Sequence, residues 1–159
     1  MLEIELVCVG RIKERYYAEA AAEYIKRLGA WCRVHVTELP EARRDGDSPA
    51  ATAAALRKEA DAVRAAVPKG AALAALCVEG KEYSSEELSV QLEKLASGGV
   101  SRLCFLIGGS DGLDESLKRE ARLRISMSRM TFPHHLARVM LLEQLYRALS
   151  IAAGGKYNK

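Results

Sequence analysis

The sequence predicts an α/β fold in which a mostly parallel sheet is flanked by helices. Short apolar runs alternate along the chain with segments of helical periodicity, and some of these runs are apolar throughout, as strands covered on both faces are. Alternating strands and helices favour parallel pairing with helices on each side of the sheet. Because 49% of the 159 residues are hydrophobic and only four are proline, we expect residues 1–159 to form a single domain.

Local signals give the order of the elements. Gly10, Gly29 and the Pro68-Lys69-Gly70 turn end three segments, and Ser84 with the following glutamates opens a helix with a hydroxyl cap and acidic first turn. We expect strands over 4–9, 34–39, 71–78, 103–107 and 123–127. We expect helices over 16–28, 50–67, from 84 onward, over 113–121, and from 133 to 149 or beyond.

Several classes of protein are disfavoured by composition. Four cysteines are widely spaced and favour buried free thiols over disulfides or a zinc site: Cys8, Cys32, Cys77 and Cys104. Adjacent histidines such as His134 and His135 do not share one helix face, so no metal is expected. No apolar stretch approaches the roughly 20 residues of a bilayer crossing, and the start lacks a signal peptide, which predicts a cytoplasmic protein with no membrane association.

The net charge of +3 is unevenly distributed. Residues 101–159 carry ten basic against five acidic side chains, whereas residues 1–100 carry 14 against 16. A positive C-terminal part is compatible with a polyanionic partner and also with an ordinary solvated face.

Three segments should meet at the carboxyl edge of the sheet, where parallel folds bind ligands: 76–81, 108–112 and 127–132. The glycines of Gly108-Gly109-Ser110-Asp111-Gly112 permit close approach of backbone to a ligand, although a plain strand-to-helix turn has the same composition. The loop lacks the Walker and dinucleotide-binding spacings, so nucleotide hydrolysis and nicotinamide chemistry are not indicated.

The segment 126–134 mixes thioether, aromatic and hydroxyl groups, and its backbone is partly fixed by Pro133. One interpretation is a loop that wraps an adenine with apolar faces and main-chain hydrogen bonds. The other is structural: Met130 and Phe132 anchor the last helix in the core, and Thr131 caps it.

The last helix carries an apolar stripe that Leu141 widens beyond what one sheet face would cover, which suggests a subunit interface. Arg138 and Arg147 are candidates to face RNA phosphates, although Glu143 and Arg147 are also spaced for an ordinary ion pair. The end of the chain, 154–159, predicts a disordered terminus by composition, yet Lys156, Tyr157 and Lys159 suit phosphate contact and base stacking.

Together these segments resemble one family, the bacterial large-subunit ribosomal RNA methyltransferase H family of the SPOUT class. The resemblance runs nearly end to end. It is carried by five motifs: Val9-Gly10-Arg11-Ile12-Lys13 with Tyr16, Leu76 to Lys81, Phe105 to Ser110, Met130 to His134, and Leu141 to Ala148.

This resemblance implies a specific function and site. The family transfers a methyl group from S-adenosylmethionine to N3 of a pseudouridine in 23S ribosomal RNA, through a C-terminal trefoil knot and as a homodimer whose sites lie at the subunit interface. Carried over position by position, the cofactor contacts are Leu76, Gly108, Met127, Ser128, Arg129, Met130, Thr131 and Phe132. The RNA contacts expected are Arg138, Arg147, Lys156, Tyr157, Asn158 and Lys159.

One position departs from the family pattern. Members usually end in Tyr-His followed by Lys or Arg, whereas this chain ends Tyr157-Asn158-Lys159. An amide does not titrate near neutral pH, so Asn158 cannot take up a proton as histidine does. Asn158 can still hydrogen-bond a base edge or a phosphate. Three interpretations stay open: the family's histidine is a binding group, or His134 or water takes the proton, or this member is slow. The candidate catalytic residues are His134 and Asn158.

Two other functions remain open on the sequence. One is a SPOUT relative that methylates another RNA position, such as a ribose 2′-hydroxyl. The other is a non-catalytic ribosome-binding factor that kept the fold, an alternative that Asn158 leaves open.

Overall fold

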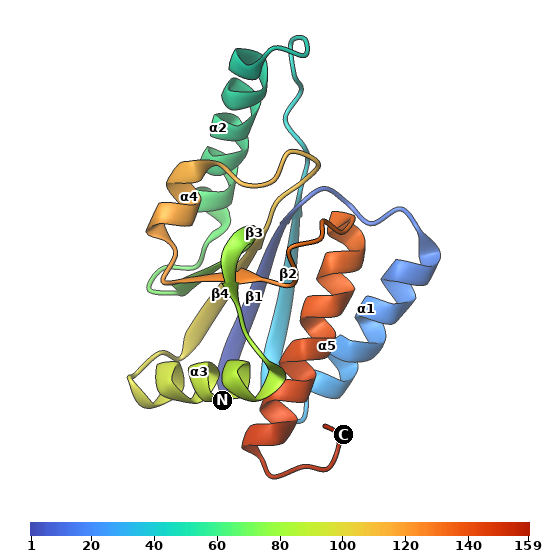
Figure 1. Cartoon of the computed structure of the whole chain (residues 1–159), viewed down its shortest axis with the longest axis vertical. Helices are drawn as coiled ribbons and strands as arrows, with labels where there is room; N and C mark the ends of the chain where they lie inside the picture. Colours follow the sequence, from blue (N-terminus) through green and yellow to red (C-terminus); the bar gives the residue numbers. More distant parts are fainter.

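The computed structural model describes residues 1–159 as five strands and five helices in strict alternation (Figure 1). Each expected element is present, with shifted ends: α4 is shorter than expected and β3 is longer. The strands are β1 (Leu2–Val9), β2 (Cys32–Leu39), β3 (Ala72–Glu82), β4 (Arg102–Ile107) and β5 (Leu123–Ser126). The helices are α1 (Arg15–Leu28), α2 (Pro49–Ala66), α3 (Ser85–Ser97), α4 (Glu115–Glu120) and α5 (His134–Ala152).

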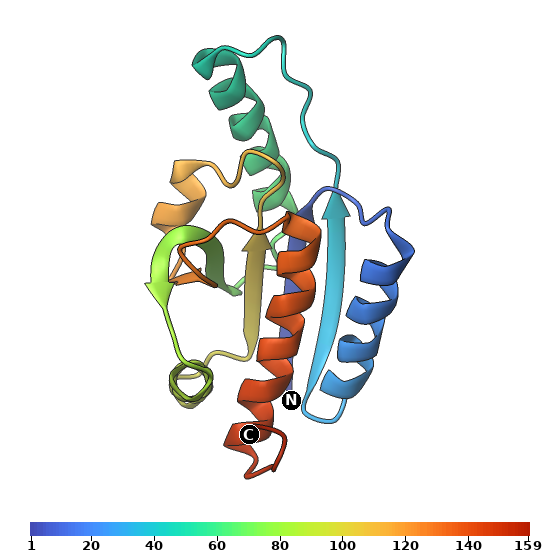
Figure 2. The same ribbon diagram turned by 45° about the vertical axis from the view of Figure 1, so that its right-hand side comes forward.

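All strand pairs are parallel, and the strand order is β2-β1-β4-β3-β5. Helices α1, α3 and α5 cover one face of the sheet, and α2 and α4 cover the other (Figures 1 and 2). The prediction of a parallel α/β fold is therefore confirmed. The trefoil knot implied by the resemblance stays a prediction.

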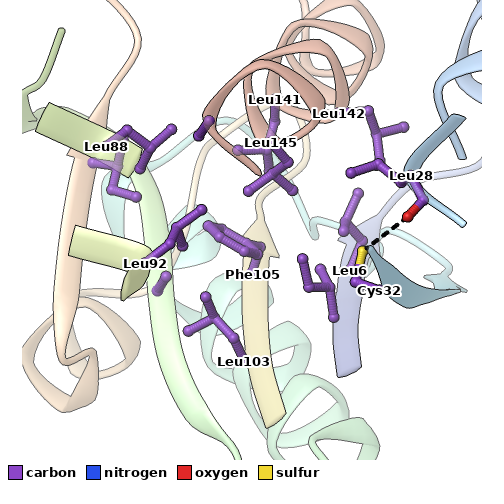
Figure 3. Packing of buried hydrophobic residues seen from close by; sticks show 14 of the residues in the cluster. Leu6, Leu28, Cys32, Leu88, Leu92, Leu103, Phe105, Leu141, Leu142 and Leu145 are labelled. Atoms are coloured by element: carbon purple, nitrogen blue, oxygen red, sulfur yellow. Dashed lines mark hydrogen bonds between the residues drawn. The ribbon is translucent and has the colours of Figure 1, made fainter. Parts of the chain in front are cut away.

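The larger core lies between the sheet and α1, α3 and α5. Phe105 of β4 is fully buried at its centre, between Leu92 of α3 and Leu145 of α5 (Figure 3). Leu141, Leu142 and Leu145 are each 0% exposed. Leu141 therefore packs inward, and the expectation that it widens the outer apolar surface of the last helix is wrong.

The smaller core lies between the sheet and α2 and α4, and it includes Val63 and Leu117. All four cysteines are free, as predicted, and Cys8, Cys32 and Cys104 are buried. Burial raises the pKa of the Cys104 thiol to about 12, so this side chain packs as a small neutral group.

Strand β3 departs most from a regular strand. It pairs with β5 through Leu76↔Ile125 and again through Lys81↔Ile125, so residues 77–80 bulge out of the ladder. Gly80 closes this bulge against the backbone of β5, where a Cβ would lie 2.8 Å from the carbonyl carbon of Arg124. The bulge sends residues 77–79 away from the sheet and toward the glycine loop that follows β4.

Helix α3 begins directly after the extended end of β3. The Ser84 hydroxyl accepts a hydrogen bond from the Glu87 N–H at 3.0 Å, and the Glu87 carboxylate accepts one from the Ser84 N–H at 3.3 Å. This capping box fixes the point at which β3 turns into α3, as the Ser84 signal predicted.

No helix is both long enough and apolar enough to cross a bilayer. No group of three or more His, Cys, Asp or Glu side chains gathers in the way that metal ligands do.

We expect Phe105→Ala to lower the free energy of unfolding by about 3–5 kcal/mol, because it leaves a cavity between the sheet, α3 and α5. Val90→Ala, at a site 45% exposed on α3, serves as the control and should change it by less than about 0.5 kcal/mol. Urea denaturation measures both. Equal effects for the two variants would contradict this description of the core.

Candidate functional site

One pocket of about 620 Å³ opens beyond the carboxyl ends of β4 and β5 and beside the bulge of β3. Its volume lies within the range of about 300–1,000 Å³ that is usual for small-molecule sites. The three segments predicted to converge do so here. They contribute most of its walls, through 76–79, 107–113 and 127–128 together with 130–134, and Lys118 and Ala137 complete it.

The glycine loop after β4 folds tightly on itself. Gly109 and Gly112 form a backbone bridge, and Gly112 has a φ of +78°, which glycine adopts without strain. A Cβ on Gly108 would overlap the carbonyl group of Gly112. Gly108 is therefore required by the loop itself, and any larger residue there changes the shape of this wall of the pocket.

Glu41, which follows β2, holds the outer side of this loop. Its Oε1 accepts hydrogen bonds from the Ser110 N–H at 2.9 Å and the Ser110 hydroxyl at 3.0 Å. Burial would raise the pKa of the Glu41 carboxyl, but these two hydrogen bonds hold it below its usual range. The carboxylate therefore stays charged and links the β2 end of the sheet to the pocket.

A salt bridge crosses the pocket between the β3 bulge and α4. The Lys118 ammonium, whose side chain is 13% exposed, donates to Glu79 of the bulge and to Glu115 at 3.1 Å. Burial alone would lower the pKa of Lys118, but the two carboxylates raise it above its usual value. The pocket therefore contains fixed charges of both signs next to its apolar walls.

The loop from β5 to α5 forms the remaining wall. The Ser126 hydroxyl donates to the Ser128 carbonyl at 2.9 Å, and the Ser128 hydroxyl accepts from the Met130 N–H at 3.1 Å. Met130 is 72% exposed, unusual for a large apolar side chain. The structural interpretation of Met130 as a core anchor is therefore wrong. The expected Thr131 cap is also absent, because α5 has no side-chain cap and its N-cap residue is Pro133.

The eight residues expected to contact a cofactor lie close together, although they come from three separate parts of the chain. Seven of them line the pocket: Leu76, Gly108, Met127, Ser128, Met130, Thr131 and Phe132. Arg129 does not; it is exposed and lies beside Glu82 at the outer side of the loop.

His134 lies at the inner end of the same pocket. Its Nε2 packs against Gly10, where a Cβ would come within 3.0 Å, and its ring stacks edge-on against His135 at a centroid distance of 4.2 Å. Burial, and then the neighbouring His135, lower the pKa of His134 below 6.5. Its imidazole is therefore neutral at pH 7 and has a nitrogen able to accept a proton.

Arg138 is placed differently from the expectation. Its side chain is 5% exposed, and it donates to Glu38 Oε2 at 2.8 Å and to the Gly10 carbonyl at 3.2 Å. These bonds fasten the first turns of α5 to the carboxyl ends of β1 and β2. A side chain that is buried and already paired is not free to contact RNA phosphates.

Known proteins resemble this chain over nearly its whole length. A family model described as "Predicted SPOUT methyltransferase" matches residues 2–158. The chain belongs to the SPOUT methyltransferase family.

Curated relatives in this family match over their whole length. Three are named "Ribosomal RNA large subunit methyltransferase H". The one from Streptococcus suis is 40% identical over 99% of this chain and 100% of its own. The one from Listeria monocytogenes is 42% identical with the same coverage, and the one from Pelotomaculum thermopropionicum is 45% identical over 99% of each chain.

The C-terminal tail of this SPOUT methyltransferase lies far from the pocket of its own chain. It follows the last turn of α5, whereas the pocket is at the first turn (Figures 1 and 2). The amide of Asn158 donates to Glu86 at 2.9 Å and accepts from Arg147 at 3.2 Å. Of the two candidate catalytic residues, only His134 lies in the pocket.

The tail packs back against α5 through side-chain contacts. Arg147 donates twice to Glu143, at 2.5 and 3.0 Å, and lies 4.6 Å from the centroid of the Tyr157 ring. The Tyr157 hydroxyl also donates to Glu143, at 3.2 Å. Arg147 therefore forms the ion pair that its spacing allowed, while Lys156 and Lys159 stay exposed without a carboxylate partner.

Sequence reasoning missed the Lys118–Glu79 pair. Lys118 lies in the second turn of a short helix and carries no motif that separates it from the other cations of the chain. Glu79 lay within a segment that was expected at the site, but its role depends on the bulge of β3, which no local pattern indicated.

We expect the His134 imidazole to titrate with a midpoint below 6.5, because burial opposes its charged form. The folded pKa lies below the unfolded value, so stability should fall as the pH drops from 7 through the folded pKa and level off below it. NMR titration of the imidazole nitrogens, with His134→Asn to assign the signal, measures the midpoint. A midpoint at or above 6.5 would contradict the burial described here.

Proposed function

We propose that this chain acts as one domain that transfers a methyl group from S-adenosylmethionine to N3 of a pseudouridine in 23S ribosomal RNA, in the cytoplasm and as a homodimer. The observation that carries the proposal is the convergence of Leu76, Gly108 and Met130, from three separate segments, on one pocket. The family model describes methyltransferases and the curated relatives are named for large-subunit ribosomal RNA, so both support methyl transfer to this RNA.

The chemistry of the pocket suits this cofactor. Leu76, Met127 and Phe132 offer apolar faces for an adenine, and the glycine loop offers backbone groups at its edge. Glu79 and Lys118 form a salt bridge beside these walls, which gives this side of the pocket a polar lining. When bound, S-adenosylmethionine supplies an activated methyl group, so the protein has only to align the reactants and remove a proton.

His134 is the residue that we propose as acceptor of the N3 proton. It lies in the pocket, its lowered pKa keeps it neutral at pH 7, and its ring position is fixed by Gly10 and His135. Asn158 has no comparable capacity to take up a proton. In this proposal Asn158 is a binding group of the tail.

The separation between tail and pocket supports a dimer with antiparallel α5 helices. The 19 residues of α5 span about 28 Å, so the tail does not reach the pocket of its own chain. An antiparallel partner brings the tail of one subunit to the pocket of the other. Half-buried Val139 and Met140 border a groove of about 490 Å³ along α5 that such a partner would cover.

In this arrangement the tail is the part of the partner subunit that contacts RNA. Lys156 and Lys159 are exposed and unpaired, whereas Tyr157 is half-buried against Arg147 and Tyr146 and is proposed to anchor the tail. Glu143 neutralises the charge of Arg147, whose proposed role is to hold Tyr157 and Asn158 in place. Arg138 is left out of the proposed contacts because it is buried.

We expect the purified protein to methylate ribosomes from cells that lack its gene, at N3 of one pseudouridine. We also expect the Gly108→Ala variant to bind S-adenosylmethionine at least about tenfold more weakly. The added Cβ overlaps the Gly112 carbonyl and reshapes the pocket wall. Calorimetry measures binding, and mass spectrometry of digested 23S RNA locates the methyl group. Gly29→Ala, at an ordinary helical φ of −56°, is the control and should bind normally. Ribosome binding without cofactor binding would favour a non-catalytic factor instead.

A mixing experiment tests the composite site. Gly108→Ala has a weakened pocket, and a chain ending at Gly155 lacks the tail, so at a cofactor concentration well below the Kd of Gly108→Ala each homodimer should be nearly inactive. Refolding the two together should restore about a quarter of wild-type activity, because half of the dimers would contain one complete site. Methyl incorporation from labelled cofactor measures the recovery. No recovery from the mixture would contradict a site shared between subunits.

A further inference from the structure

The ion pairs of the structure show which cations remain free to bind a polyanion. Arg138 and Arg147 are bonded to Glu38 and Glu143, and Lys118 is held by two carboxylates. A separate group of cations between the end of α4 and the loop after β5 forms no ion pair: Arg119, Arg122, Arg124 and Arg129. We call these four residues the β5 cationic edge.

This group occupies one border of the sheet. Strand β5 is the last strand in the order β2-β1-β4-β3-β5, so one side of it has no neighbouring strand. Arg122 lies directly before β5, and its backbone N–H continues the ladder by donating to the Leu73 carbonyl at 2.8 Å. It is two residues from Arg124, so the two side chains point to the same face. Arg124 pairs with Ala75, which belongs to the core beneath α2 and α4, so this is the face on which α4 and its Arg119 lie. All four guanidinium-bearing residues are exposed.

The β5 cationic edge borders the proposed cofactor pocket of the same chain. The backbone of Arg124 lies directly against Gly80, at the end of the bulge that forms one pocket wall. Lys118 first, and more distantly the Arg124 charge, hold the pKa of the pocket carboxyl Glu79 below its usual range. Arg129 lies next to Met130, which lines the pocket.

Acidic residues do not cancel this charge. Glu120 is the only carboxylate within 119–129, and it is bonded to Arg64 of α2, while Glu79 is bonded to Lys118. Glu82 beside Arg129 is the one exposed and unpaired carboxylate at this border. The border therefore carries an excess of positive charge next to the opening of the pocket.

We propose that the β5 cationic edge binds phosphates of the substrate RNA and holds the strand beside the pocket of the same subunit. The inference rests on the proposed function, since it gives the rRNA substrate a second contact surface in addition to the tail of the partner subunit. Exposed, unpaired arginines release counterions from RNA and position its backbone without reading its sequence. The RNA beside the reactive base is then contacted by both the tail of the partner subunit and this edge.

Cations on an edge strand also prevent the edge-to-edge pairing of sheets. That role explains Arg122 and Arg124, but it does not extend to Arg119 in a helix or to Arg129 in a loop. RNA contact accounts for all four residues, because α4, β5 and the loop after β5 all border the pocket through Lys118, the Arg124 backbone and Met130.

The test compares Arg122→Gln/Arg124→Gln with the wild type for binding to large ribosomal subunits from cells that lack the gene. We expect the Kd for subunits to rise at least about tenfold, while the Kd for S-adenosylmethionine stays within about twofold. The slope of log Kd against log salt concentration should become shallower by about one to two. Arg122→Lys/Arg124→Lys, which keeps both charges, should retain most of the affinity.

Arg33→Gln/Lys94→Gln is the matched control, because both residues are exposed and unpaired but lie on β2 at the opposite edge of the sheet and on α3. It should shift the Kd for subunits by less than about twofold. Equal effects of the two double variants, or wild-type affinity in Arg122→Gln/Arg124→Gln, would overturn the edge proposal alone. A wild-type protein that binds neither subunits nor cofactor would overturn the proposed function, and this inference with it.

Discussion

The pocket depends on one feature of the backbone, the bulge of four residues (77–80) between the two points at which β3 pairs with β5. These residues have no partner in the ladder, so they leave the sheet and stand opposite the glycine loop of β4. Gly80 permits this arrangement because only a residue without a side chain fits against the β5 backbone there. The bulge sets the spacing between the walls contributed by β3 and β4, and it brings Glu79 within reach of Lys118.

Much of this fold is predictable because burial leaves a direct trace in the sequence. Short, fully apolar runs such as 103–107 favour strands covered on both faces, and the glycine loop that follows marks the next turn. The register shift in β3 and the position of Lys118 depend on pairing between distant segments, which leaves no local pattern. The prediction that Leu141 widens the outer apolar surface was wrong for a related reason. Periodicity shows which residues are apolar, but it does not show how deeply a helix is buried between its neighbours.

The candidate site shows the same division. Leu76, Gly108 and Met130 were expected together because carboxyl ends of parallel strands share one edge of a sheet. Arg138 and Arg147 were expected to face RNA because charge alone does not reveal which carboxylate lies opposite in the fold. Glu38 is 100 residues from Arg138 in the chain, and only the packing of α5 against β1 and β2 brings them together. Pairing of this kind decides which cations remain available to a polyanion.

The Glu38–Arg138 ion pair also bears on how the chain is made. Translation at about 5–20 residues per second delivers Arg138 some 5–20 s after Glu38 has been synthesised. During that interval the ends of β1 and β2 lack the helix that neutralises and covers them. The ends of β1 and β2 therefore receive their cover from α5 only when the nascent chain is almost finished.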